Sequence, residues 1–334
     1  ARMNPTPDPR KIVLSGVRPT GPLHLGNYVG ALRNWIAFQD LYRCFYAIVP
    51  WHALSSEYAN AKAIRGWSYE VAVDWLSVGL DPEKCVMFLQ SEVKEHAELH
   101  LLLSMITPLP WLERVPTFKE QLKELQEKEL NTYGFLGYPV LQAADIILYK
   151  ADLVPVGEDQ AAHVELTREI VRRFNRLYGP IFPEPRTMLT EVPRLAGTDG
   201  RKMSKSYGNA IYLKDSAETI RAKILPMVTD TRRVRRTDPG EPDDCPVFTL
   251  HKAFVPKDVR EDIARGCRTA GIGCRDCKAV LLEHLFRFLE PVWERRRALE
   301  KNPERIWEIF EAGNSRARRV AQATMAEVRD ALGF

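Results

Sequence analysis

A short basic segment near the middle of the chain has residue types suited to handling phosphate. Arg201–Ser206 reads RKMSKS and follows the flexible stretch Gly197–Gly200. Its two lysines and two serines place positive charge and hydrogen-bond donors within a few residues. Such a loop suits a pyrophosphate leaving group, because the charge of that group grows in the transition state. The plain alternative is a basic surface loop.

A second candidate lies near the start of the chain, in the turn Gly16–Asn27. This turn has neither the Gly-x-Gly-x-x-Gly spacing of a dinucleotide site nor the Gly-Lys-Ser/Thr ending of a P-loop. Its last residues include His24 and Asn27, which can donate hydrogen bonds to phosphate oxygens, and Gly26, which leaves room for a flat base. A helix is expected to begin here, and helix N-termini attract anions. A glycine-rich turn with a surface histidine is the alternative interpretation.

Four of the six cysteines are grouped in a C-x21-C-x6-C-x2-C pattern, at Cys245, Cys267, Cys274 and Cys277. Four thiols in one region indicate a metal site in a protein of a reducing compartment. Cys44 and Cys85 stand in apolar runs instead, so we expect them to be buried as small hydrophobic residues.

The elements that must position these residues follow from the apolar pattern. Strands are expected at 11–16, 44–49, 85–90 and 154–156, and an amphipathic helix at 61–78 is stopped by Gly79. Short apolar strands alternating with helices predict an α/β fold with a doubly wound, Rossmann-like parallel sheet. Ligands bind at the carboxyl ends of such strands, where the Gly16–Asn27 turn would lie.

The rest of the chain is predicted to be mostly helical. A helical insertion is expected at about 97–153, with breaks at Pro108, Pro110, Pro116 and Gly137–Pro139. After Met203 helices dominate, apart from a loop at 238–244. We therefore predict a flexible leader at 1–10, a catalytic domain at 11–225 and a helical domain at 226–334.

Composition narrows the class of protein. The chain has 334 residues, of which 28% are charged, with a net charge of +4. No apolar run is long enough for a membrane span, and no secretory signal is visible, so a cytoplasmic location is expected. Basic clusters at Arg232–Arg236, Arg295–Arg297 and Arg316–Arg319 indicate a surface that contacts nucleic-acid phosphates, or solvated helix faces.

The two phosphate-handling segments together resemble the signatures of class I aminoacyl-tRNA synthetases. Within that class the chain is most similar to the bacterial tryptophanyl-tRNA synthetases, from Ile12 to the C-terminus. Further stretches that carry the resemblance are 16–21, 26–28, 138–146 and 154–160. The chain departs from common patterns at three positions: Asn27 replaces a second histidine, Arg18 a glutamine, and Gln142 a methionine.

The resemblance implies a reaction and its partners. ATP would activate L-tryptophan to tryptophanyl-adenylate with release of pyrophosphate, Mg²⁺ would assist, and the amino acid would pass to tRNA-Trp. The helical domain would bind the anticodon, and the inserted helices near 97–149 would form a homodimer interface. Two alternatives are an enzyme like the tyrosyl-tRNA synthetases, and a paralogue that binds tryptophan or its adenylate as a regulatory partner.

The resemblance also implies site residues. His24, Asn27, Lys202 and Lys205 would be catalytic. The ATP site would comprise Gly16, Arg18, Pro19, Thr20, His24, Gly26, Asn27, Gly157, Glu158, Asp159, Val192, Lys202, Met203, Ser204, Lys205 and Ser206.

For tryptophan, the carboxylate of Asp145 would accept the indole N–H, because a carboxylate only accepts hydrogen bonds; a helix cap is the other role open to it. Tyr138 and Gln160 would hold the α-ammonium group. The indole would be surrounded by Leu14, His52, Gln142, Val154 and Val156.

The cysteine group has a counterpart in this family. Some bacterial members carry a very similar set that holds a [4Fe–4S] cluster near the anticodon-binding region, although the first gap is one residue shorter here. An iron–sulfur cluster is therefore the first expectation for Cys245, Cys267, Cys274 and Cys277, ahead of zinc or an empty site.

Overall fold

A five-stranded parallel sheet forms the centre of the computed structural model, which describes residues 10–115, 129–157, 160–190 and 193–334. The strands are β1 (Ile12–Val17), β2 (Arg43–Ile48), β3 (Val86–Leu89), β4 (Leu153–Val156) and β5 (Arg186–Leu189), in the spatial order β3-β2-β1-β4-β5. Strands β2 and β3 thus follow on one side of β1, and strands β4 and β5 follow on its other side. This confirms the predicted doubly wound sheet and places a switch point between β1 and β4.

Both faces of the sheet are covered, as the apolar strands require. Val13 packs into one hydrophobic core and its neighbour Leu14 into the other, because successive strand residues point to opposite faces. On β2, Cys44 and Phe45 divide in the same way. The predicted burial of Cys44 and Cys85 is confirmed. Strand β5 was not expected, since its short segment is only partly buried and lacks a strand-like pattern.

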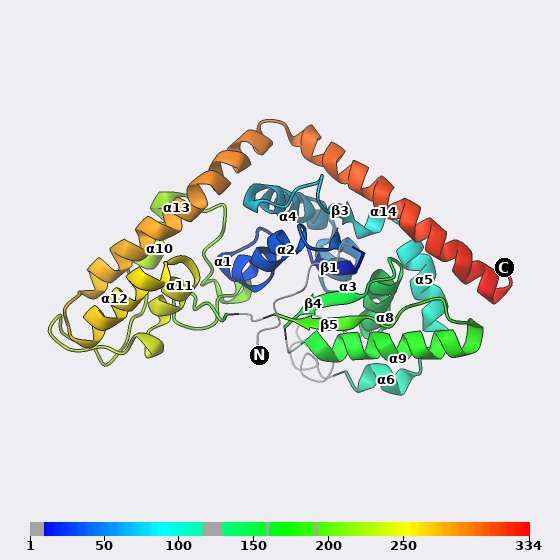
Figure 1. Cartoon of the computed structure of the whole chain (residues 1–334), viewed down its shortest axis with the longest axis horizontal. Helices are drawn as coiled ribbons and strands as arrows, with labels where there is room; N and C mark the ends of the chain where they lie inside the picture. The colour runs from blue at the N-terminus through cyan, green and yellow to red at the C-terminus, as the bar shows by residue number, and fades with distance from the viewer. Residues whose placement is uncertain (1–9, 116–128, 158–159, 191–192) are drawn as a thin grey trace.

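Helices connect the strands of the first half of the chain (Figure 1). They are α1 (Leu25–Asn27), the π-helical turn η1 (Tyr28–Leu32), α2 (Arg33–Phe38), α3 (Pro50–Glu57), η2 (Tyr58–Ala63), α4 (Ile64–Val78), η3 (Gln90–Glu92), α5 (Glu95–Ser104), α6 (Leu109–Glu113), α8 (Tyr133–Ile147) and α9 (Ala161–Tyr178). Helix α4 ends at Gly79, as predicted.

The expected break at Gly137–Pro139 is wrong. Helix α8 starts behind the capping side chain of Thr132 and continues through Pro139 to Ile147. A proline inside a helix removes one backbone hydrogen bond, and here the loss is tolerated because burial of the helix supplies compensating contacts. Pro108 and Pro110 lie at the start of α6 as expected, whereas Pro116 lies outside the described residues.

The last third of the chain contains η5 (Lys205–Tyr207), α10 (Ala217–Ile224), η6 (Pro242–Asp244), α11 (Pro246–Phe254), α12 (Lys257–Arg268), α13 (Cys274–Glu300) and α14 (Pro303–Leu332). In Figure 1, α13 rises from the lobe of α10–α12 to the top of the molecule, and α14 descends along the other side. No helix in the described part of the chain has the length and apolar character needed to cross a membrane.

Helix α14 packs directly on the edge strand β3. A Cβ at Gly313 would lie 1.7 Å from the carbonyl oxygen of Met87, so only glycine permits this approach. The next residue, Asn314, accepts a hydrogen bond from the backbone N–H of Leu89 at 2.8 Å. The apolar core is therefore continuous across position 226, and the predicted division into two domains stays a prediction.

Candidate functional site

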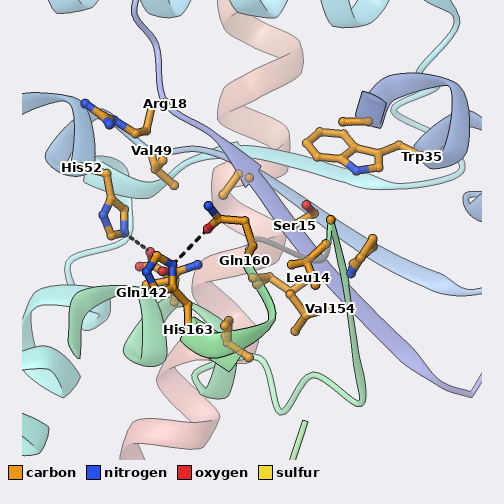
Figure 2. Close-up of a pocket in the computed structure, with 18 of the residues that line it drawn as sticks. Leu14, Ser15, Arg18, Trp35, Val49, His52, Gln142, Val154, Gln160 and His163 are labelled. Carbon is orange, nitrogen blue, oxygen red and sulfur yellow. Dashed lines mark hydrogen bonds and ion pairs between the residues drawn. The ribbon is translucent and has the colours of Figure 1, made fainter. Parts of the chain in front are cut away.

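A cavity of about 410 Å³ opens at the carboxyl ends of β1 and β4, where the sheet changes direction. Its size fits a small organic ligand. All eight residues predicted to contact tryptophan line it, namely Leu14, His52, Tyr138, Gln142, Asp145, Val154, Val156 and Gln160. Figure 2 shows that labelled members of this set surround one hollow although they come from separate strands and helices.

Helix α8 contributes three of these residues from a single face. Tyr138, Gln142 and Asp145 are spaced by four and three positions, which is the spacing of neighbours on one side of a helix. Unexpected wall residues extend the cavity along β1 toward α2: Ser15, Gly30, Asn34 and Trp35. Ser15 lies on β1 and the other three lie on η1 and α2, and none of them stands out from its neighbours by a recognisable motif.

The carboxylate of Asp145 is buried and held by three side chains. Its Oδ2 atom lies 2.6 Å from Nε2 of His52, and its Oδ1 atom lies 2.6 Å from Nδ1 of His96. The amide nitrogen of Gln90 donates to both oxygens, at 2.8 and 3.0 Å. Burial raises the pKa of this carboxyl, but the two histidines outweigh burial and hold the pKa below its ordinary value. Asp145 is therefore ionised and accepts hydrogen bonds, as a side chain that recognises an N–H group must.

Gln90 and His96 were missed by the sequence analysis. The side-chain oxygen of Gln90 accepts the backbone N–H of Trp51 at 3.2 Å, which turns its amide nitrogen toward Asp145. Nε2 of His96 lies 2.7 Å from the hydroxyl of Tyr149, whose pKa is raised by burial. The hydroxyl can donate to Nε2, and Nδ1–H of a neutral His96 then donates to Asp145. These partners lie on other elements, so no local pattern links them to Asp145.

A histidine also joins the two residues predicted to hold the α-ammonium group. Nε2 of His163 lies 3.3 Å from the hydroxyl of Tyr138, and Nδ1 of His163 lies 3.0 Å from the side-chain oxygen of Gln160. Gln160 is the N-cap residue of α9 and His163 lies in its first turn. This geometry orients two polar groups toward the same part of the cavity.

The turn before α1 has a defined hydrogen-bond geometry. Nδ1 of His24 accepts the backbone N–H of Asn27 at 3.2 Å, and the side-chain oxygen of Asn27 accepts the backbone N–H of His24 at 3.0 Å. Burial and the nearby Lys202 lower the pKa of His24 to about 4. Since Nδ1 of the neutral ring is an acceptor here, Nε2 carries the proton and can donate to a ligand.

The basic loop lies against this turn. A Cβ at Gly26 would come 2.9 Å from the ring of His24 and 3.7 Å from Cβ of Met203. The ammonium group of Lys205 donates to the carbonyl oxygen of Thr20, and it lies 5.2 Å from the ring centre of Trp67. Segments about 180 residues apart in the sequence thus meet, with both lysines exposed and Met203 buried.

Buried Asn209 fixes the shape of the basic loop. Its side-chain oxygen accepts the backbone N–H of Ser204 at 2.8 Å, and its amide nitrogen donates to the carbonyl oxygen of Lys202 at 3.1 Å and to Asp199 at 2.8 Å. The side chain of Ser204 caps the short helix η5 by accepting the backbone N–H of Ser206. The loop is therefore ordered by its own polar contacts.

Some of the remaining predicted ATP residues are described by the structure and the others are not. Gly16, Arg18 and Gly157 line the same cavity as the tryptophan set, and Pro19 is buried beside Thr20 in the adjoining turn. Glu158, Asp159 and Val192 lie outside the described residues.

The four grouped cysteines are neighbours but do not form a metal centre in the structure. The pKa of Cys277 is raised to about 12 by burial and by the proximity of Cys245, Cys267 and Cys274. All four thiols are free. Among the described residues, no group of three or more His, Cys, Asp or Glu side chains is arranged to hold a metal ion. The expected cluster or zinc ion is therefore not shown by the arrangement of the described residues.

Several arginines of the three basic clusters contact other residues of the protein. Arg296 is buried, and Arg233 donates to the carbonyl oxygen of Arg236. Arg316 and Arg318 donate to the carbonyl oxygens of Pro82 and Glu92. These guanidinium groups therefore make contacts within the protein, and the predicted phosphate-contacting surface stays a prediction.

The chain is similar to known proteins over most of its length. Residues 7–290 match the model of the family described as tRNA synthetases class I (W and Y). A tryptophan–tRNA ligase of Thermotoga maritima is 52% identical, over 96% of this chain and 99% of its own length. One of Aquifex aeolicus is 46% identical, over 96% and 99%. A crystal structure of tryptophanyl-tRNA synthetase from Campylobacter jejuni, complexed with ADP and tryptophan, superposes with a TM-score of 0.88 at 34% identity, over 97% of this chain and 100% of that one.

Proposed function

The chain belongs to the class I tRNA synthetases for tryptophan and tyrosine, and from that membership we infer that it is a tryptophan–tRNA ligase. It activates L-tryptophan with ATP and then transfers the amino acid to tRNA-Trp. The observation that carries the choice of tryptophan is the identity of 52% to a tryptophan–tRNA ligase over 99% of that protein.

We propose that the indole ring enters the cavity between Leu14 and Val154 and donates its N–H to Asp145. Of the three side chains that hold this carboxylate, only His52 also lines the cavity; Gln90 and His96 are fully buried behind it. The indole N–H would therefore take the place of His52 at Oδ2. A buried acceptor selects strongly against rings without a donor, since its own hydrogen bond would be lost.

The activation step follows from the two loops. The tryptophan carboxylate attacks the α-phosphate of ATP, the bond from the α-phosphorus to the bridging oxygen breaks, and pyrophosphate leaves with that oxygen. No side chain is needed as a nucleophile, so positioning and charge stabilisation carry the step. We propose that Nε2–H of His24 and the side-chain amide of Asn27 donate to phosphate oxygens, and that Lys202 and Lys205 bind the leaving pyrophosphate.

We propose that Mg²⁺ binds together with ATP, because in such sites it is held by substrate phosphates, waters and one or two carboxylates, and it neutralises phosphate charge. Lys205 must release the carbonyl oxygen of Thr20 before it can reach a phosphate. A small closure of the basic loop over ATP would therefore accompany the first step.

The second step needs a surface for tRNA and a partner subunit. We propose that the region from residue 226 onward contacts the anticodon, in the cytoplasm, through the guanidinium groups left exposed among the basic clusters. A homodimer is supported by apolar side chains exposed on the insertion: Leu101 on α5, Met105 at its C-cap, Leu109 at the start of α6, and Tyr133 at the start of α8. Exposed apolar patches of this kind mark protein–protein interfaces.

We also propose Cys245, Cys267, Cys274 and Cys277 as the ligand set of a [4Fe–4S] cluster. Support comes from the number and type of the ligands and from their mutual proximity. Since no metal-holding group is arranged among the described residues, the thiols would have to shift to bind a cluster. Its role would be to tie η6, α12 and the start of α13 together, away from the ATP loops.

The deciding experiment is aminoacylation of tRNA-Trp by the purified chain with labelled tryptophan and, separately, labelled tyrosine. We expect charging with tryptophan only. Charging with tyrosine would assign the chain to the other branch of the family. Binding of tryptophan and ATP without charging of any tRNA would identify a regulatory paralogue.

A further inference from the structure

The residue before His24 is held by a carboxylate from a distant helix. The backbone N–H of Leu23 donates to Oδ2 of Asp74, on α4, at 2.8 Å. The side chain of Asp74 is fully buried. Its other oxygen, Oδ1, accepts a hydrogen bond from Nη1 of Arg296, on α13, at 2.5 Å. A two-residue chain of polar contacts thus runs from α13 to the peptide that precedes His24.

The guanidinium group of Arg296 is fixed from three sides. Its Nη2 atom donates to Glu70 at 2.7 Å and its Nε atom donates to Glu300 at 2.8 Å, in addition to the contact with Asp74. Arg296 is itself buried. Burial raises the pKa of Asp74 to about 7 while Arg296 opposes the rise. Buried ion pairs are costly and are often replaceable by apolar residues without loss of stability, so stability alone does not account for this arrangement.

The same helix also holds the segment that follows the basic loop. Trp293 lies three positions before Arg296 on α13, and its Nε1–H donates to the carbonyl oxygen of Leu213 at 3.0 Å. The backbone N–H of Leu213 donates to the carbonyl oxygen of Leu23 at 3.0 Å, and the N–H of Leu25 donates to that of Ile211 at 2.9 Å. Residues 23–25 and 211–213 therefore lie side by side, and α13 contacts Leu213 directly and reaches Leu23 through Asp74.

We propose that Asp74 and Arg296 are positioning residues for the activation of tryptophan. They fix the peptide of Leu23 and, through it, the direction of Nε2–H of His24, without touching ATP themselves. This inference rests on the proposed function, because it assigns His24 to a phosphate of ATP. A displacement of about 1 Å at a catalytic group can lower a rate by roughly a hundredfold.

Two double variants isolate the hydrogen bond to Leu23 from the charges. Asp74→Asn with Arg296→Met removes both charges but leaves a side-chain oxygen that can accept the N–H of Leu23. Asp74→Leu with Arg296→Met removes both charges and the acceptor. Removing both partners avoids an unpaired buried charge, which would destabilise the fold.

The readout is ATP–pyrophosphate exchange, with the affinity for tryptophan measured separately by equilibrium dialysis. We expect the Asp74→Leu double variant to have a kcat/KM for ATP roughly tenfold to a hundredfold below that of the Asp74→Asn double variant, with equal affinity for tryptophan. Equal exchange by the two variants, or a parallel loss of tryptophan affinity, would overturn the inference.

Arg295→Met is the matched control. Arg295 is the neighbouring residue on α13, and its Nε atom donates to the carbonyl oxygen of Ser77 on α4 at 2.6 Å. This contact joins the same two helices but does not reach Asp74. We expect exchange within about twofold of the wild type. A loss as large as that of the Asp74→Leu double variant would show that helix packing, rather than the bond to Leu23, is responsible.

If the Asp74→Leu double variant does not fold, Arg296→Lys tests the same contact. Lysine keeps the charge but lacks the planar fork that contacts Asp74, Glu70 and Glu300 together. A lower kcat/KM for ATP with unchanged tryptophan affinity supports the inference, and unchanged kinetics contradicts it. Absence of exchange in the wild-type chain would instead refute the proposed function.

Discussion

Nε2 of His52 lies 2.6 Å from Oδ2 of Asp145, and both side chains belong to the wall of the same cavity. The other contacts of this carboxylate, from Gln90 and His96, come from the closed side. The imidazole of His52 thus contacts the carboxylate oxygen on the cavity side, where a ligand ring would enter. In the proposed indole site, binding would exchange the His52 donor for the indole N–H at a carboxylate that stays ionised.

The first prediction concerns this acceptor. Asp145→Ala should weaken tryptophan activation by at least about a hundredfold, since a site built around a polar contact loses discrimination and binding when the contact is removed. ATP–pyrophosphate exchange at varied tryptophan measures the effect. Because the substitution also leaves His96 and Gln90 without their partner, thermal unfolding and ATP affinity must be recorded alongside. A folded variant with unchanged exchange would remove Asp145 from the indole site.

The second prediction concerns the leaving group. Lys205→Met should lower the activation rate by orders of magnitude while tryptophan affinity changes little, because the charge that Lys205 meets develops only in the transition state. Lys257→Met is the charge-matched control: Lys257 lies on α12, and its recorded ion pair is with Glu261 one turn away. A parallel loss of rate and affinity would make Lys205 a ground-state binding residue.

The third prediction concerns pH. Burial and Lys202 lower the pKa of His24 to about 4, so the neutral ring should persist from pH 7 to 5. An NMR titration of His24 should have its midpoint near 4, and Lys202→Met should raise the midpoint because a positive neighbour is removed. A midpoint near the ordinary value of about 6.5 would contradict the neutral donor.

The same shift has a defined effect on stability. The unfolded chain protonates this histidine at about pH 6.5, whereas the folded chain does so only near pH 4. The folded state is therefore favoured above pH 6.5, and this contribution falls as the pH is lowered toward 4 and then levels off. Replacing His24 with asparagine should flatten that part of the stability profile, measured by urea unfolding.

The fourth prediction concerns assembly. Sedimentation should show a dimer, and Met105→Glu should shift it toward the monomer, because Met105 is 71% exposed beside Leu101 on α5. Leu225→Glu is the control, since Leu225 is 43% exposed at the end of α10, outside the insertion. An active monomer in the wild-type chain would contradict the proposed interface.

The fifth prediction concerns metal. Protein purified without oxygen should be brown and contain about four irons per chain, as a Cys₄-ligated cluster requires. About one zinc per chain would indicate a tetrahedral site instead. Cys277→Ser should abolish the iron but leave adenylate formation intact, since the ATP loops involve none of these cysteines. Anaerobic protein with neither metal and four titratable thiols would refute the site.

The sequence by itself predicted four of the five described strands and the two motifs proposed to bind phosphate. Strands such as β1 are local apolar runs. His24, Gly26, Lys202 and Lys205 stand in short contiguous motifs, so their proposed roles can be inferred without knowledge of distant residues. The sequence did not place Tyr138, Gln142 and Asp145 on one helix, because it predicted a break at Gly137–Pro139. That local signal was overridden by burial of the whole helix.

Only the tertiary structure decided which residues surround Asp145 and which residues hold His24. His52, Gln90 and His96 reach the carboxylate from α3, η3 and α5, and Asp74 and Arg296 reach Leu23 from α4 and α13. No local pattern distinguishes these residues from their neighbours; Arg296, for example, is one of three consecutive arginines. A hydrogen bond depends on distance and direction in space, and 222 positions of chain separate Asp74 from Arg296. Folding around the sheet, rather than any pattern along the chain, creates those contacts.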